Sequence, residues 1–184
     1  RVHPIITKGG DLVNSVPADV RIETYVRAKT MEAIEATHTK VDAALKAGGD
    51  AVGAQTVIAT MPGQLPLACN NRLNELFVAN AKIAEPNVAV KDAGHFSAST
   101  DMGDVSHLLP VIHPFIGGVD GFLHTADFHV VDFKHAVLLP AKAFAMMIID
   151  LLADDAELAR QIKAEHHPLL TKEEYIAKLD KYFQ

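Results

Sequence analysis

The stretch Val20–Arg27, with the sequence VRIETYVR, alternates apolar and polar side chains. This alternation is typical of a β-strand with one covered face, because successive side chains of a strand point to opposite sides. Upstream, the extended run Val2–Thr7 is followed by a turn signal, KGGD, at Lys8–Asp11. The two runs predict a pair of strands joined by an irregular polar link at residues 14–19.

The residues that follow predict a helix and a third strand. Thr30 is suited to cap a helix whose apolar residues recur at helical spacing and which ends at Gly48-Gly49. Ala54–Met61 then predicts a strand that Pro62 stops. Strand, strand, helix and strand in this order indicate a small antiparallel α+β module over residues 1–64.

Residues 65–184 predict helices around a loop-rich tract. The expected helices cover Asn70–Ala84, a long span from an Asp132 cap to Leu152, Asp154–Ala164 and Thr171–Phe183. Pro140 either kinks the long helix or stands in its true first turn. The tract Val88–Gly121 contains one apolar run, Pro110–Ile116, that predicts a strand. The whole chain is therefore expected to have an α/β fold.

Composition excludes several classes of protein. Of the 184 residues, 49% are hydrophobic and the formal net charge is −6, which excludes a disordered chain and disfavours nucleic acid as a partner. No apolar run approaches the ~20 residues that span a bilayer, so we expect no membrane partner, and Ala143–Leu152 favours a core helix. The single cysteine, Cys69, fits a reducing, cytoplasmic compartment. It is interpreted as a small buried apolar residue.

Histidines are concentrated between residues 95 and 135, together with several aspartates. Imidazole and carboxylate groups are ligands for zinc, manganese or iron and also act as general acids and bases. No pair has a recognised ligand spacing, so a solvated loop is the simpler alternative and an independent metal-binding protein a further one. The histidines are His95, His107, His113, His124, His129 and His135.

Three residues stand out as site candidates. His124 follows a glycine-rich turn after the predicted strand at 110–116, and such loops commonly carry ligands in α/β proteins. Arg27 ends its strand on the same face as Tyr25, where its guanidinium is able to hold a carboxylate in a bidentate pair. A surface role is the alternative for Arg27. Asn14, in the link between the first two strands, completes the set.

Two runs of the sequence carry a family resemblance. His3–Asp19 contains the pattern Gly-Gly-x-x-x-Asn-x-Val-Pro and is followed by Arg27. It resembles the dimerisation domain of the dinuclear-metal aminoacylase/carboxypeptidase amidohydrolases, with the aminobenzoyl-glutamate hydrolase branch closest. Ser99–His107 and Gly121–Thr125 resemble the second half of that family's catalytic domain. The resemblance implies that residues 1–64 are the remainder of an α+β dimerisation domain and residues 65–184 the C-terminal part of an α/β/α catalytic domain.

The resemblance also implies a function. Members of the family use two divalent metal ions, zinc or manganese, to cleave an amide bond in a small acyl-amino acid or peptide-like substrate. His124 matches the family's last metal ligand. Asn14 and Arg27 match residues that bind substrate, often across a homodimer, and the chemistry of an amide and a guanidinium suits that role.

The same resemblance implies that this chain lacks most of the catalytic apparatus. The family's first metal ligands and its glutamate pair lie upstream of what corresponds to Arg1, and the sequence starts without an initiator Met in what we interpret as mid-strand. We therefore expect a piece of a longer polypeptide, inactive alone, that binds no metal tightly and contains no catalytic residue. A non-catalytic dimerisation or binding module is the alternative.

Overall fold

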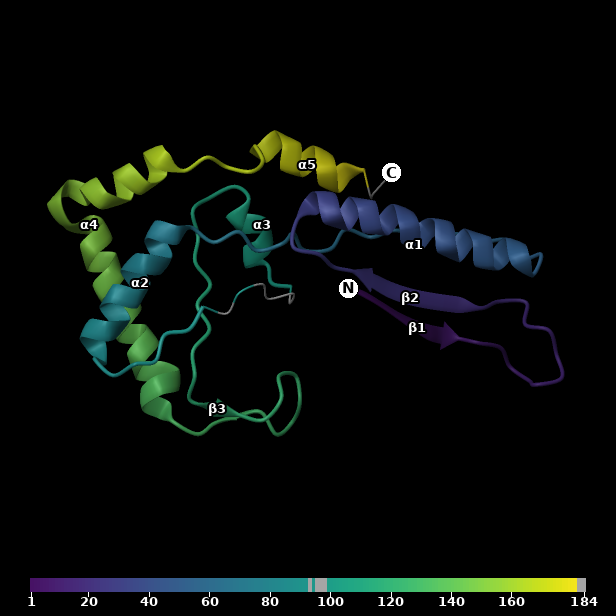
Figure 1. Cartoon of the computed structure of the whole chain (residues 1–184), viewed down its shortest axis with the longest axis horizontal. Helices are drawn as coiled ribbons and strands as arrows, with labels where there is room; N and C mark the ends of the chain where they lie inside the picture. Colours follow the sequence, from purple (N-terminus) through teal and green to yellow (C-terminus); the bar gives the residue numbers. More distant parts are fainter. Residues whose placement is uncertain (93, 95–98, 182–184) are drawn as a thin grey trace. The chain divides into compact units, whose positions relative to one another are not determined.

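The computed structural model describes residues 1–92, 94 and 99–181, which form two units (Figure 1). Unit 1 covers Arg1–Pro66 with Ser99, and unit 2 covers the other described residues from Leu67 onward. Helices and small antiparallel sheets are mixed along the chain, which confirms the α/β fold class. The assignment of the two segments to a dimerisation domain and a catalytic domain stays a prediction.

Unit 1 begins with the two predicted strands. β1 (Val2–Lys8) pairs antiparallel with β2 (Arg21–Val26), in a register that places Val2 opposite Val26. Near the connecting loop, Asp19 accepts ion pairs from Arg21, at 2.9 Å, and from Lys8, at 3.2 Å. The side-chain hydrogen bonds from Arg21 and then Lys8 lower the pKa of Asp19. This charged triad closes the loop end of the hairpin.

Helix α1 (Met31–Ala51) follows, and the N–H of Ala33 donates to the Thr30 hydroxyl at 3.3 Å, so the predicted cap is confirmed. The helix continues through Gly48-Gly49 for two more residues. None of its residues is buried, and Leu65 is the one buried apolar side chain among the described residues of unit 1. The helix and the hairpin of unit 1 therefore do not enclose a core of their own.

The third strand predicted at Ala54–Met61 is wrong: this segment pairs with no strand. A strand requires a hydrogen-bonded neighbour, and within the described residues β1 and β2 pair with each other alone. The segment is instead tied to the end of α1, because the N–H of Ala54 donates to the carbonyl of Gly49 at 2.9 Å. Strand-forming composition does not make a strand without a partner.

Unit 2 is built on two helices that lie side by side, α2 (Asn71–Ala84) and α4 (Leu139–Glu165) (Figure 1). The N–H of Leu73 donates to the Asn70 side chain at 3.1 Å, so the predicted α2 is confirmed with its cap. The rings of Phe77 and Phe144 lie 4.9 Å apart across the helix pair. The buried cluster comprises Leu73, Phe77, Ala81, Ala143, Met147 and Ile162.

Helix α4 has irregular backbone at its start and near its middle. A π-helical turn, η1 (Lys134–Leu138), precedes it, and Pro140 stands in its first turn, as one of the two alternatives predicted. At Ala153–Ala156 the backbone is not helical. The predicted pair of helices, ending at Leu152 and restarting near Asp154, corresponds to the two parts on either side of this break.

The remaining elements of unit 2 are short. They are α3 (Met102–Ser106), β3 (Val119–Asp120), β4 (His129–Val130) and α5 (Lys172–Asp180). The capping box predicted at Thr171 is confirmed, since Thr171 and Glu174 exchange side-chain-to-backbone hydrogen bonds. The α5 residue Tyr175 donates to Asp104 of α3 at 3.2 Å, and burial, more than this carboxylate, raises the pKa of Tyr175.

The strand predicted at Pro110–Ile116 is also wrong. Pro110 and Pro114 have no N–H to donate, and the carbonyl of Val111 accepts from Asn70 at the start of α2, at 2.8 Å, rather than from a strand. Ile112 and Ile116 pack against the core of the helix pair. The apolar pattern was therefore produced by packing against helices rather than by membership of a sheet.

The helical span Lys134–Glu165 is long and apolar enough, by length and composition alone, to cross a membrane, and it is the single such span among the described residues. The apolar run predicted from the sequence ends at Leu152, so a span of this length was not expected. A core helix has the same composition, but only 17% of the most apolar 18-residue window is buried within this chain. Lys142, Asp150 and the break at Ala153 are features that membrane helices rarely contain. The absence of a membrane partner stays a prediction.

The helix pair generates a stability prediction. Met147 is 5% exposed, and Met147→Ala should lower the free energy of unfolding by about 2–5 kcal/mol, because it leaves a cavity between α2 and α4. Ile149→Ala, at a side chain that is 67% exposed, should change it by less than about 0.5 kcal/mol. Urea unfolding of the two variants measures both values. Equal losses would contradict the packing described.

Candidate functional site

His124 lies in the loop of a small hairpin in unit 2. β3 and β4 pair with Val119 opposite Val130 and Asp120 opposite His129, and the loop between them carries His124 on the surface. The segment 110–116 before the glycine turn is not a strand, and the hairpin begins after it, at Val119. The loop is held by local hydrogen bonds: the Asp120 carboxylate accepts from the N–H of Gly121 at 2.8 Å, and the Phe122 carbonyl accepts from the Thr125 hydroxyl at 2.6 Å.

The backbone of His124 is in the left-handed region, with φ at 67°. This conformation disfavours side chains with a Cβ and costs about 1–2 kcal/mol outside glycine. Strain of this kind is common where a loop presents a functional side chain. Among the described histidines, His124 is the one with a positive φ, and its role as a metal ligand stays a prediction.

Two glycines make the loop possible. Gly118 and Gly121 have φ values of 89° and 87°, and a Cβ at Gly121 would lie 2.5 Å from the Asp127 carbonyl oxygen. A Cβ at Gly118 would lie 2.6 Å from the Asp132 carbonyl oxygen. The glycine-rich turn seen in the sequence thus allows the residues before His124 to lie close to the residues after it.

Asp132 joins the hairpin to the helix that follows. Its N–H donates to the Gly118 carbonyl at 3.0 Å, and its carboxylate accepts from the N–H of His135 at 3.1 Å, as the predicted helix cap should. The His135 ring nitrogen Nδ1 lies 2.6 Å from the same carboxylate. The His135 side chain is the main reason that the pKa of Asp132 is lowered. The loop that carries His124 is therefore attached to α4 at its base.

The described residues do not by themselves form a metal centre. A catalytic zinc site uses about three protein ligands, and no three His, Cys, Asp or Glu side chains in the described part of the chain gather in a way that could hold a metal ion. Near His124, the Asp127 carboxylate accepts from the Thr125 hydroxyl, which is the main reason that its pKa is lowered. A two-metal centre would need ligands from elsewhere.

The other described histidines within residues 95–135 are buried or contact different groups, and do not share a partner. His107 is buried, Nε2 of His113 lies 3.4 Å from the Thr100 hydroxyl, and Nδ1 of His129 lies 2.6 Å from the Asp127 carbonyl oxygen. His95 lies outside the described residues. Within residues 99–135, the structure thus gives no support to an independent histidine-rich metal site.

Arg27 follows β2 in unit 1 and lies on the same face as Tyr25, as the alternation predicts. Its guanidinium carbon is 5.1 Å from the centre of the Tyr25 ring. Within the described part of the chain Arg27 has no carboxylate partner, and its buried Nε makes no hydrogen bond. A half-buried guanidinium that has no carboxylate partner among the described residues is a good receptor for an anion.

Asn14 is exposed in the loop between β1 and β2, at the opposite end of the hairpin from Arg27. The six residues of β2 separate the two ends by about 20 Å, so the hairpin does not bring Asn14 and Arg27 together. His124 belongs to unit 2, which the structure describes separately. The sequence-predicted residues are thus each placed but not assembled into one site.

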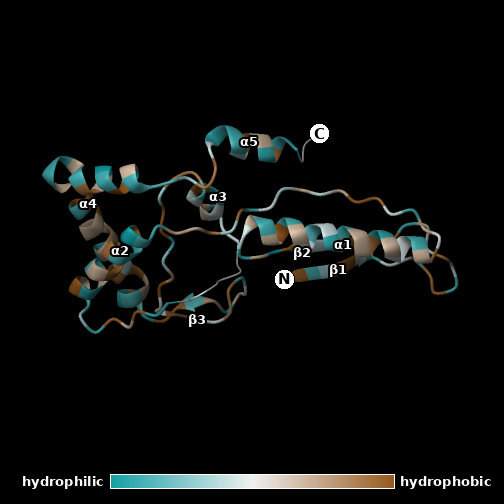
Figure 2. Ribbon diagram, turned by 45° about the horizontal axis from the view of Figure 1, so that its top comes forward, coloured by the Kyte–Doolittle hydropathy of each residue, from teal (hydrophilic) through white to brown (hydrophobic). Residues whose placement is uncertain are grey.

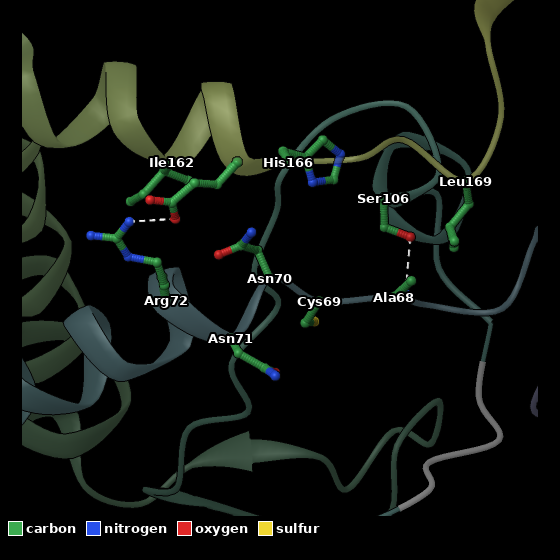
Figure 3. Close-up of a pocket in the computed structure, with 10 residues that line it drawn as sticks. Ala68, Cys69, Asn70, Asn71, Arg72, Ser106, Ile162, His166 and Leu169 are labelled. Atoms are coloured by element: carbon green, nitrogen blue, oxygen red, sulfur yellow. Dashed lines mark hydrogen bonds and ion pairs between the residues drawn. The ribbon is translucent and has the colours of Figure 1, made fainter.

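A cavity of about 380 Å³ at the start of α2 was not predicted from the sequence (Figure 3). Arg72 pairs with Glu165 at its edge, with 2.6 Å between guanidinium nitrogen and carboxylate oxygen. The Ser106 hydroxyl accepts from the N–H of Ala68 at 3.0 Å. Cys69 lines this cavity and is partly exposed, which corrects its interpretation as buried. The residues come from three distant stretches without a spacing pattern, so the sequence carried no signal for them.

Comparisons with known proteins indicate a hydrolase of the peptidase type. The chain is 30% identical over 166 residues to the Xaa-Arg dipeptidase of Mus musculus, an alignment that covers 86% of this chain and 38% of the relative. It is 26% identical over 184 residues to the Xaa-Arg dipeptidase of Homo sapiens, covering 96% of this chain and 42% of the relative. The chain is thus a distant homologue that spans about two fifths of the length of these relatives. No family model and no solved structure matches.

The strained backbone at His124 generates a prediction. His124→Gly should raise the free energy of unfolding by about 1 kcal/mol, because glycine adopts a positive φ without strain. His124→Ala keeps the Cβ and should give no such gain. Thermal unfolding of both variants provides the measurement. A loss of stability in His124→Gly would show that the imidazole makes stabilising contacts, contrary to its exposed position.

Proposed function

We propose that this chain is part of a metal-dependent hydrolase that cleaves the amide bond of a dipeptide or small acyl-amino acid. The observation that carries the proposal is the similarity to two proteins named Xaa-Arg dipeptidase over nearly the whole chain. The sequence resemblance to the aminoacylase/carboxypeptidase amidohydrolases supports the same reaction class. The closest branch within that family, aminobenzoyl-glutamate hydrolase-like, is kept as the finer part of the proposal.

Arg27 is proposed to bind the carboxylate of the substrate. Its guanidinium has no carboxylate partner in the described part of the chain, and the Tyr25 ring beside it restricts its orientation. Dipeptides and acyl-amino acids both end in a carboxylate, which forms bidentate pairs with arginine. Asn14 is proposed to contact substrate too; because one hairpin separates it from Arg27, the two would act at different active sites of a homodimer.

His124 is proposed as one ligand of a two-metal centre, zinc or manganese, whose other ligands lie outside the described residues. Its exposed ring and strained backbone support this role. The proposed homodimer is supported by unit 1, in which a 21-residue helix has no buried residue and several hairpin side chains, including Ile5 and Ile6, are exposed. A further chain or segment is needed to cover these surfaces.

A hybrid protein tests the proposed function. This chain replaces the matching segment of the mouse Xaa-Arg dipeptidase, and the hybrid is assayed for hydrolysis of dipeptides ending in arginine and of N-acyl amino acids. We expect hydrolysis with bound zinc or manganese, and less metal and less turnover in His124→Ala than in the control His129→Ala from the same hairpin. A folded hybrid without hydrolysis would favour the non-catalytic module. Equal metal content in both variants would remove His124 from the centre.

Arg27→Ala tests the substrate site in the same hybrid. The loss of a buried charge partner should weaken substrate binding by about 2–5 kcal/mol, which corresponds to an increase in KM of roughly thirty-fold or more, with metal content unchanged. The control is Arg21→Ala, since Arg21 lies on the same face of β2 but is paired with Asp19. If Arg27→Ala leaves KM unchanged and only lowers the unfolding temperature, Arg27 has a structural role.

A further inference from the structure

Helix α4 has two apolar faces and buries one of them. Leu139, Ala143 and Met147 are buried against α2 and its surroundings. On the other side, at helical spacing, Ile148 and Ile149 are 55% and 67% exposed. Figure 2 shows hydrophobic residues along the part of α4 that lies beside α2. We call the exposed set the outer face of α4; it comprises Ile148, Ile149 and Leu152, together with Val137 of the preceding turn η1.

A helix that is apolar on both sides is typical of a protein interior rather than a surface. Contiguous exposed apolar patches of this kind are rare on soluble monomers and mark interaction sites. Asp150 lies on the side of the helix that faces α2, and Lys142, two turns before Ile149, lies at the edge of the outer face. The outer face is therefore a surface with a partner.

We propose that the outer face of α4 is covered by a polypeptide layer equivalent to the part of the Xaa-Arg dipeptidases that this chain does not match. The inference rests on the proposed function, because the same relatives identify the occupant. More than half of each relative lies outside the alignment, enough chain to supply such a layer. The occupant presents its own apolar side chains to Ile148 and Ile149.

A second feature of unit 2 supports a polypeptide as the occupant. The run at residues 110–116 is strand-forming in composition, and its Ile112 and Ile116 pack on the α2–α4 core, yet it belongs to no ladder within the described residues. Between its two prolines, and beside the Val111 carbonyl that accepts from Asn70, the backbone groups of Ile112 and His113 are left for a further polypeptide that also covers the outer face. A lipid surface has no backbone groups with which to pair.

The polar neighbours of the outer face also disfavour lipid. The buried Asn80 of α2 donates to the Asp150 carboxylate at 2.7 Å, so this charge is part of the α2–α4 contact halfway along the helix. Carboxylates at such a depth are expensive in a bilayer. The helix then breaks at Ala153, and a helix intended to cross a membrane rarely does so at three consecutive left-handed residues.

The double variant Ile148→Asn/Ile149→Asn tests the proposal in two settings: this chain alone and the hybrid with the mouse dipeptidase. In the chain alone, where both side chains are exposed, the unfolding temperature should change by less than about 2 °C. In the hybrid it should fall by about 5 °C or more, because two amides become buried without partners. Leu109→Asn, at a 57% exposed residue of unit 2 that lies after α3 and outside α4, is the matched control and should have a small effect in both settings.

Three results would overturn the proposal. The first is a hybrid as insensitive to the double variant as the chain alone, and the second is a hybrid that does not form a soluble folded protein. The third is flotation of the chain with phosphatidylcholine/phosphatidylserine vesicles, or its sedimentation as a dimer, when the double variant abolishes that behaviour. The unfolding temperature does not depend on hydrolysis. A hybrid that is inactive but is destabilised by the double variant therefore counts against the proposed function alone. A hybrid that is active but is not destabilised by the double variant counts against this inference alone.

Discussion

The contact between α2 and α4 is the constraint on which unit 2 depends. Apolar side chains from both helices form the one buried cluster, and the buried Asn80 adds a hydrogen bond to Asp150 within the same contact. The neighbouring segments take their positions from this pair. Residues 110–116 pack on it, and the hairpin that carries His124 is attached to the start of α4 through Asp132. The described residues of unit 1 form no comparable cluster, which makes its hairpin and helix dependent on further contacts.

Local signals in the sequence predicted the helices and the first hairpin well. Thr30, Asn70 and Thr171 cap helices where expected, because capping depends on a few adjacent residues. The two further strands failed for one shared reason. Ala54–Met61 and Pro110–Ile116 have strand composition, but a strand also needs a neighbour, and neighbours are a property of the whole molecule. The π-helical turn and the break in α4 had no sequence signal that we recognised.

The candidate site was predictable only in its parts. Alternation placed Arg27 beside Tyr25, and the glycine turn located the loop of His124, since both are short-range effects. The predicted strands already placed Asn14 and Arg27 at opposite ends of the hairpin, but sequence order did not show which residues outside the hairpin lie near either of them. Nor could it reveal the cavity beside α2, whose lining residues are distant along the chain. The similarity to the dipeptidases then supplied a reaction class that no single residue here defines.

The break at Ala153–Ala156 has a consequence for the end of the chain. An uninterrupted helix would place Ile162 about 28 Å from Ala143, yet both residues are buried in the cluster that α4 forms with α2. The three left-handed residues change the direction of the last turns of α4. This change of direction also brings Glu165 to Arg72 in the first turn of α2. The backbone angles at Ala153–Ala156 thus determine whether residues 157–181 pack on the helix pair or extend away from it.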